Sequence, residues 1–131
     1  VSEVDDGANL VDLEQLMKAS DVVTVHVPLS DATRNLIDAE QIAMMKPGSI
    51  IVNTARAEIV NQQALREAIA SGALWGAALD VFDTEPLDRD DVFVTSGSTT
   101  ITPHLAGTTR QAFVQGPIWI GERMAEIVAS Q

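Results

Sequence analysis

The sequence of 131 residues contains no cysteine, and only eight of its residues are lysine or arginine. The lack of cysteine excludes disulfides and thiolate metal sites and fits a reducing compartment, so we expect a cytoplasmic protein. Nineteen acidic residues bring the formal net charge to −11, which repels nucleic-acid phosphates and anionic membrane surfaces. Neither nucleic acid nor a membrane is therefore an expected partner.

Long apolar runs are missing as well. None approaches the ~18 residues that a membrane-spanning helix needs, and the chain does not open with a charged and then apolar signal segment. Apolar residues still make up 46% of the chain, which is enough for one packed core. We expect one soluble domain.

Short apolar runs alternate with segments of helical spacing, which predicts an α/β fold built on a parallel sheet. The runs are apolar throughout, as in parallel strands that helices cover on both faces. The predicted strands are 21–27, 49–53, 75–80 and 99–102, with a further short strand at 92–95, and the predicted helices are 10–17, 39–45, 62–70 and the residues from 108 onward.

Polar residues follow three of the predicted strands. Arg56 comes after the second strand, Asp80 ends the third and Glu85 follows it, and His104 comes after the fourth. Ligands of open parallel sheets bind outside the carboxyl ends of the strands. These four residues are therefore the candidate site.

The residue types suit one reaction. An imidazole oriented by a carboxylate can exchange a proton near neutral pH, so Glu85 and His104 form a candidate acid/base pair. A fixed guanidinium such as that of Arg56 can bind a substrate carboxylate through two parallel hydrogen bonds. Together these groups predict redox chemistry on a small 2-hydroxy or 2-keto acid.

Each residue also has a plainer interpretation when it is taken alone. His104 can be a loop histidine bonded to the backbone, Glu85 a solvated turn residue and Arg56 a member of a surface ion pair. Asp80 can be a helix cap or turn former, and His26 is read as a packed or edge histidine.

Four linked motifs, in order and spacing, resemble the NAD-binding domain of the D-isomer-specific 2-hydroxyacid dehydrogenases, in particular phosphoglycerate-dehydrogenase-like members. The resemblance runs from about residue 10 to about residue 126. The motifs are SDVVTVHVPLSDATRNLI (20–37), MKPGSIIVNTARAEIV (45–60), GAALDVFDTEPL (76–87) and TPHLAG (102–107).

The resemblance implies a role for each site residue. His104 would donate the proton to the substrate carbonyl, Glu85 would orient it, and Arg56 would bind the substrate carboxylate. Hydride would come from the nicotinamide of NAD in its reduced form, NADH, with NADP left open. The implied cofactor contacts are Val27, Pro28, Thr33, Thr54, Ala55, Arg56, Asp80, His104, Ala106 and Gly107.

Members of this family normally carry a GxGxxG turn and a following acidic residue, and neither occurs in this sequence. We therefore expect residues 1–131 to form an incomplete dinucleotide-binding domain, a partial doubly wound sheet without its first glycine-rich βαβ half, from a fragment or truncated form of the enzyme. A smaller departure is Ala57, where the family usually has glycine. The backbone beside Arg56 can therefore differ in conformation from that of other family members.

The missing half leaves an alternative open. The chain can also be a non-catalytic nucleotide-binding or oligomerising module derived from that family. Without a neighbouring strand, 21–27 becomes a sheet edge, which is a template for association. We expect a homodimer or higher oligomer that buries this edge or the C-terminal helix bearing Trp119.

Overall fold

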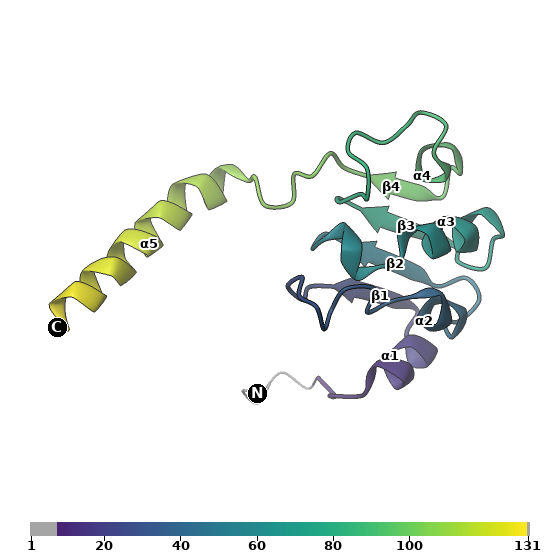
Figure 1. The fold of residues 1–131 in the computed structure, drawn as a ribbon, viewed down its shortest axis with the longest axis horizontal. Helices are drawn as coiled ribbons and strands as arrows, with labels where there is room; N and C mark the ends of the chain where they lie inside the picture. The colour runs from purple at the N-terminus through teal and green to yellow at the C-terminus, as the bar shows by residue number, and fades with distance from the viewer. Residues whose placement is uncertain (1–7, 131) are drawn as a thin grey trace.

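The structure is a computed structural model and describes residues 8–130. Four parallel strands form one sheet in the order β1-β2-β3-β4, and the expected α/β, partial Rossmann-like fold is confirmed (Figure 1). The strands are β1 (Val22–Val25), β2 (Ile50–Asn53), β3 (Gly76–Leu79) and β4 (Thr99–Ile101). The helices are α1 (Leu13–Ala19), α2 (Ala39–Ala43), the 3-10 helix η1 (Ala57–Ile59), α3 (Gln62–Ala70), α4 (Val92–Thr95) and α5 (Arg110–Ala129).

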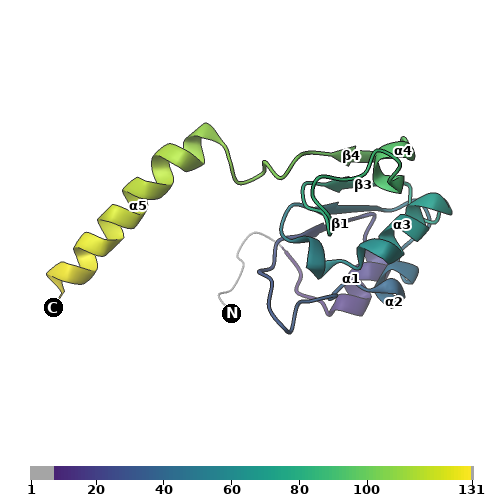
Figure 2. The same cartoon turned by 45° about the horizontal axis from the view of Figure 1, so that its top comes forward.

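The core lies between the sheet and the helices on one side of it. Val23, Ile51 and Ala77 are register partners on β1, β2 and β3, so their side chains point to the same face, and all three are buried. α1, α2 and α3 cover this face (Figure 2).

The pattern of the strands predicts helices on both faces, but β1 is an edge strand with one open face, as the expected sheet edge at 21–27 implies. Residues of this strand alternate between exposed and buried, and Val22 on the open face remains 53% exposed. The physical reason is that no helix among residues 8–130 packs over that face.

Local sequence signals set the ends of α3. The side chain of Asn61 accepts a hydrogen bond from the N–H of Ala64 at 3.0 Å and caps the first turn. Gly72 lies just past the last turn at a φ of 74°, a conformation that glycine adopts without strain. The prediction of a helix over 62–70 is confirmed at both ends.

The predicted short strand at 92–95 is wrong, because these residues form α4. Asp91 caps this helix by accepting a hydrogen bond from the N–H of Phe93 at 2.8 Å, and Phe93 is buried. The cap and the burial of Phe93 outweigh the strand propensity of a Val-Phe-Val run.

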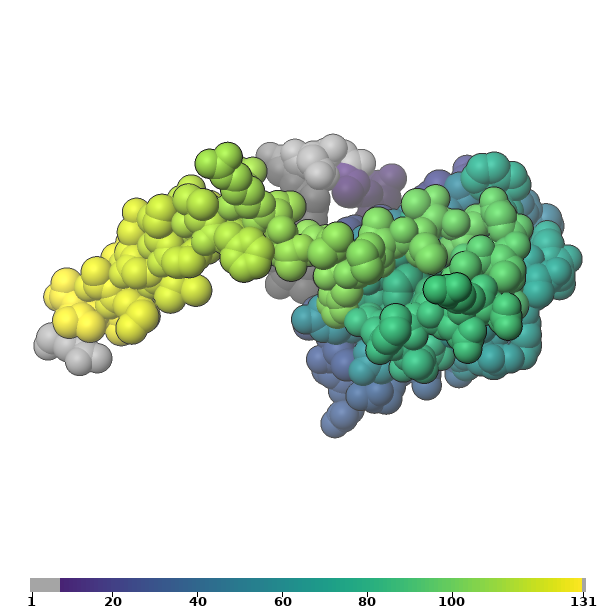
Figure 3. Space-filling model, turned by 90° about the horizontal axis from the view of Figure 1, so that it is seen from above, coloured from purple at the N-terminus to yellow at the C-terminus, as the bar shows by residue number. Residues whose placement is uncertain are grey.

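α5 extends away from the sheet after the segment 102–109 (Figures 1 and 3). None of its twenty residues is buried, although it carries large apolar side chains such as Phe113, Trp119 and Ile120. No helix in the described part of the chain is long and apolar enough to cross a membrane.

Candidate active site

The carboxyl ends of the four strands are aligned at one edge of the sheet. Val25, Asn53, Leu79 and Ile101 are register partners, one on each strand. The ladder continues for one residue beyond them, since the N–H of Asp80 donates to the carbonyl of Asn53 at 3.0 Å. The segments that carry Arg56, Asp80 and His104 therefore leave the sheet at the same edge, as the sequence predicts.

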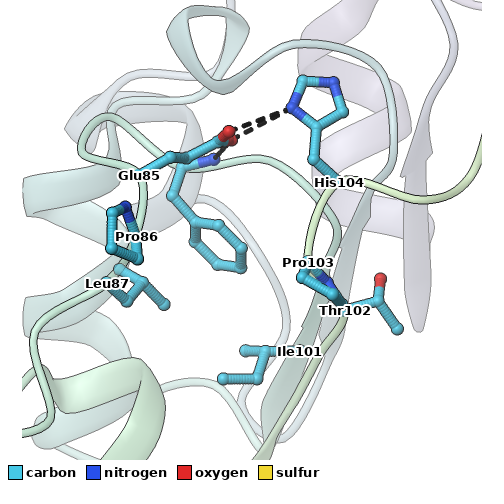
Figure 4. A pocket seen from close by; sticks show the side chains of 8 residues that line it. Glu85, Pro86, Leu87, Ile101, Thr102, Pro103 and His104 are labelled. Carbon is cyan, nitrogen blue, oxygen red and sulfur yellow. Dashed lines mark hydrogen bonds and ion pairs between the residues drawn. The ribbon is translucent and has the colours of Figure 1, made fainter.

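His104 and Glu85 are in contact. Nδ1 of His104 lies 3.1 Å and 3.2 Å from the two carboxylate oxygens of Glu85 (Figure 4). The imidazole, together with the N–H of Phe82 that donates to Glu85 at 3.0 Å, lowers the pKa of Glu85. An ionised carboxylate can only accept, so Nδ1–H is the donor and Nε2 remains available for proton exchange. Both side chains are about half exposed, so this nitrogen is accessible.

Asp80 holds the loop that presents His104. Its two carboxylate oxygens accept hydrogen bonds from the N–H groups of Leu105 and Ala106, each at 2.8 Å, and from the hydroxyl of Thr102. Burial opposes ionisation of Asp80, but these hydrogen bonds outweigh it and lower the pKa of Asp80. The turn-forming interpretation of Asp80 fits these contacts, and its role beside a cofactor stays a prediction.

The backbone of His104 supports a functional role for this loop. Its φ is 55°, in the left-handed region that residues other than glycine rarely adopt. Such conformations persist only where surrounding contacts over-determine them, and here Asp80 bonds the two residues that follow.

Asn53 holds the backbone beside Arg56. Its side chain is fully buried, accepts from the N–H of Ala55 at 3.0 Å and donates to the carbonyl of Arg56 at 2.9 Å. Sequence reasoning passed over Asn53, although a polar residue at the end of an apolar strand was a usable signal. Ala57 does not disturb this turn, because it begins η1 outside the positive-φ region and needs no glycine.

The guanidinium of Arg56 makes one hydrogen bond, from Nη1 to the carbonyl of Ala55 at 2.7 Å. No carboxylate within residues 8–130 forms a salt bridge with it, so the surface ion-pair interpretation of Arg56 is not supported. Its other donors are exposed to solvent and can bind an anion.

Two hollows lie along this edge. The first has a volume of about 470 Å³, and Arg56 lines it together with His26, Val27, Pro28, Leu29 and Ala55. The second has a volume of about 340 Å³, and the Glu85–His104 pair stands beside its apolar wall of Phe82, Pro86, Leu87, Ile101 and Pro103 (Figure 4).

The structure places the other predicted residues as follows. The hydroxyl of Thr33 donates to the carbonyl of Pro28 at 2.7 Å, so Thr33 shapes the loop behind the first hollow. His26 is exposed at the end of β1 and bonds Thr24 at 2.8 Å, so it is an edge histidine, as expected. Thr54 and Gly107 lie exposed in the segments that follow β2 and β4.

These residues fit the nicotinamide end of a dinucleotide. Val27, Pro28 and Arg56 line the first hollow, and apolar side chains beside a cation suit an aromatic ring with a polar carboxamide. The glycine turn that would hold the pyrophosphate is absent from the sequence.

The chain is similar to a known family and to individual proteins of it. Residues 1–106 match the family model of the D-isomer specific 2-hydroxyacid dehydrogenase, NAD binding domain. (S)-sulfolactate dehydrogenase of Chromohalobacter salexigens is 47% identical over 100 residues, which are 76% of this chain and 32% of that relative. D-3-phosphoglycerate dehydrogenase of Escherichia coli K12 is 42% identical over 104 residues, which are 76% of this chain and 25% of that relative.

A solved structure agrees with this result. NAD-dependent formate dehydrogenase from Staphylococcus aureus in complex with NAD has a TM-score of 0.71 and 41% identity, over 78% of this chain and 31% of that one. The chain thus spans about a third or less of each of these relatives. It belongs to the D-isomer-specific 2-hydroxyacid dehydrogenase family, whose NAD-binding domain it shares in part.

Proposed function

We propose that residues 1–131 are an incomplete dinucleotide-binding domain that supplies the catalytic groups of an NAD(P)-dependent enzyme interconverting D-2-hydroxy acids and 2-keto acids. The observation that carries this proposal is the contact between His104 and Glu85, which leaves Nε2 of His104 free at the carboxyl edge of the sheet. The same edge carries Arg56, whose outer donors have no salt-bridge partner among the described residues.

In the proposed reduction, a bound NADH would supply the hydride and leave as NAD⁺. Arg56 binds the substrate carboxylate and draws electron density from the neighbouring carbonyl. The protonated His104 donates Nε2–H to the carbonyl oxygen and transfers the proton as negative charge develops there. Glu85 keeps Nδ1–H throughout, so that the ring holds its orientation in both directions of the reaction.

The proposed cofactor contacts come from four strand ends. NAD is the proposed cofactor and NADP the alternative, because the acidic residue that distinguishes them follows a GxGxxG turn, which does not occur in this sequence. The contacts are Val27, Pro28 and Thr33 after β1, Thr54, Ala55 and Arg56 after β2, Asp80 after β3, and His104, Ala106 and Gly107 after β4.

Further proposals concern the setting of the protein. The substrate is a small 2-keto or 2-hydroxy acid, and the compartment is the cytoplasm, where a chain without cysteine needs no disulfides.

The chain is a homodimer or higher oligomer, because α5 buries none of its apolar residues and Val22 on β1 is 53% exposed.

A second candidate is a non-catalytic nucleotide-binding or oligomerising module. The observation that favours it is the absence of a GxGxxG turn from the sequence, because that turn binds the pyrophosphate.

One experiment separates the two candidates. NADH fluorescence is titrated, and reduction of small 2-keto acids is assayed, with the 131-residue chain and with a polypeptide that adds a glycine-rich half and a substrate domain (the complete enzyme). Turnover that disappears in the His104→Gln variant supports the dehydrogenase. NADH binding by the complete enzyme without turnover of any 2-keto acid supports the module.

A further inference from the structure

The segment that carries Glu85, residues 81–91, is held from the side by α3. Gln62 in the first turn of α3 is buried; its Nε2 donates to the carbonyl of Val81 at 2.9 Å and its Oε1 accepts from the N–H of Asp83 at 3.0 Å. Phe82 lies between these two clamped residues, and its N–H is the group that donates to Glu85 at 3.0 Å. One side-chain amide therefore fixes the backbone that binds the Glu85 carboxylate.

Arg66 lies one turn later on the same face of α3. Its Nη1 and Nη2 donate to the two carboxylate oxygens of Asp83 at 2.9 Å and 2.7 Å. Its Nε donates to Asp91 at 3.0 Å, and its guanidinium carbon lies 4.7 Å from the ring centre of Phe93. A single guanidinium therefore joins both ends of the segment 83–91, and Glu85 lies between the joined ends.

The environment of Arg66 makes this clamp more rigid than an ordinary surface ion pair. The side chains of Arg66 and Asp91 are only 15% and 13% exposed, whereas the Lys18–Glu14 pair of α1 is more than half exposed at both ends. The hydrogen bonds from Arg66 lower the pKa of Asp83, so its carboxylate is ionised at neutral pH. A planar guanidinium with two-point contacts fixes orientation as well as distance.

We infer that Arg66, together with Gln62, is a positioning residue that fixes the segment 81–91 so that Glu85 meets Nδ1 of His104. The inference rests on the proposed function, because positioning matters only if His104 is the acid. Neither α3 residue touches the reacting groups, and their effect passes through Glu85.

The kinetic test is a double-mutant cycle in the complete enzyme. Arg66→Gln is expected to lower kcat about tenfold, while KM for the 2-keto acid changes less than about twofold. In a Glu85→Gln background the same change is expected to lower kcat by less than about twofold, because Arg66 no longer has a carboxylate to position. The control is Glu67→Gln, which removes a charge from an exposed residue of α3 whose side chain accepts a hydrogen bond from Gln63 and none from the segment 81–91.

A second measurement does not depend on turnover. The sequence has two histidines, so labelling histidine with ¹⁵N gives the 131-residue chain two sets of imidazole signals. At neutral pH, Arg66→Gln is expected to move the Nδ1 signal of His104 most of the way to its position in Glu85→Gln, and Arg66→Lys to move it less. The His26 signals, and both histidines in Glu67→Gln, are expected to stay in place.

The outcomes separate this inference from the proposed function. Equal losses of kcat from Arg66→Gln in both backgrounds, or an unchanged His104 signal in that variant, would overturn the positioning role. If the complete enzyme turns over no 2-keto acid, the proposed function fails and the imidazole signals alone decide the positioning role. If Arg66→Gln does not fold, the same signals in Arg66→Lys decide it.

Discussion

The carboxylate of Asp80 accepts a hydrogen bond from the N–H of Ala106 at 2.8 Å, across 26 positions of sequence. This contact ties the end of β3 to the loop after β4 and fixes the loop that presents His104. The loop would otherwise have two backbone donors without partners, since Leu105 also donates to Asp80.

Asp80→Asn is expected to destabilise the fold by about 1–3 kcal/mol. The buried amide has one acceptor oxygen instead of two and directs its NH₂ group at backbone N–H donors. Urea unfolding at pH 7 checks this value. Asp88→Asn, on an exposed residue of the 81–91 segment, is the control, and equal stabilities of Asp80→Asn and wild type would contradict the anchoring role.

The lowered pKa values of Asp80 and Asp83 predict how stability depends on pH. In the unfolded chain these groups titrate near 3.9, so the unfolded state binds more protons between that pH and the lower folded values. Their contribution is complete above about pH 5 and is lost progressively as the pH falls toward and through the folded pKa values. Urea unfolding from pH 6 to pH 2.5 is expected to show a shallower acid loss in Asp80→Asn than in wild type.

His104→Gln in the complete enzyme is expected to reduce turnover by roughly 10²–10⁴-fold and to leave NADH affinity nearly unchanged. Glutamine can still donate a hydrogen bond but cannot transfer a proton at Nε2. Steady-state kinetics and NADH fluorescence measure the two effects separately. A variant that keeps more than about a tenth of the wild-type turnover would exclude His104 as the acid.

Some of these features were predictable because their causes are local in sequence. The cap at Asn61 and the glycine at position 72 set the ends of α3, and apolar runs located all four strands. The α4 residues were misassigned, because strand propensity took no account of the Asp91 cap or of the burial of Phe93.

Other features depend on distant contacts. Arg66 is 17 positions from Asp83 and 25 from Asp91, and no spacing rule pairs residues so far apart. The motifs identified Glu85 and His104 as site residues but gave no sign of the α3 side chains that hold the intervening segment. The open face of β1 cannot be predicted from the strand pattern, because an apolar strand has the same pattern whether or not a helix covers it. It was expected from the missing GxGxxG half instead.

Arg56→Lys is expected to lower kcat/KM for 2-keto acids. The fall corresponds to a loss of about 2–3 kcal/mol of transition-state stabilisation. A compact ammonium keeps the charge but cannot make two parallel hydrogen bonds to a carboxylate. Arg123→Lys, which changes an exposed α5 cation paired with Glu126, is the control in the same assay. Equal kinetics for Arg56→Lys and wild type would refute the carboxylate-binding role.

The isolated 131-residue chain is expected to associate, since α5 and the open face of β1 both leave apolar side chains exposed. The net charge of −11 opposes disordered aggregation but does not cover these surfaces, so a closed oligomer is the expected product. Sedimentation equilibrium at micromolar concentration measures it. Ile120→Lys on α5 and Val22→Lys on β1 distinguish the two surfaces, because only a change on the buried surface should shift the protein to monomer. A folded wild-type monomer across that range would count against burial of either surface.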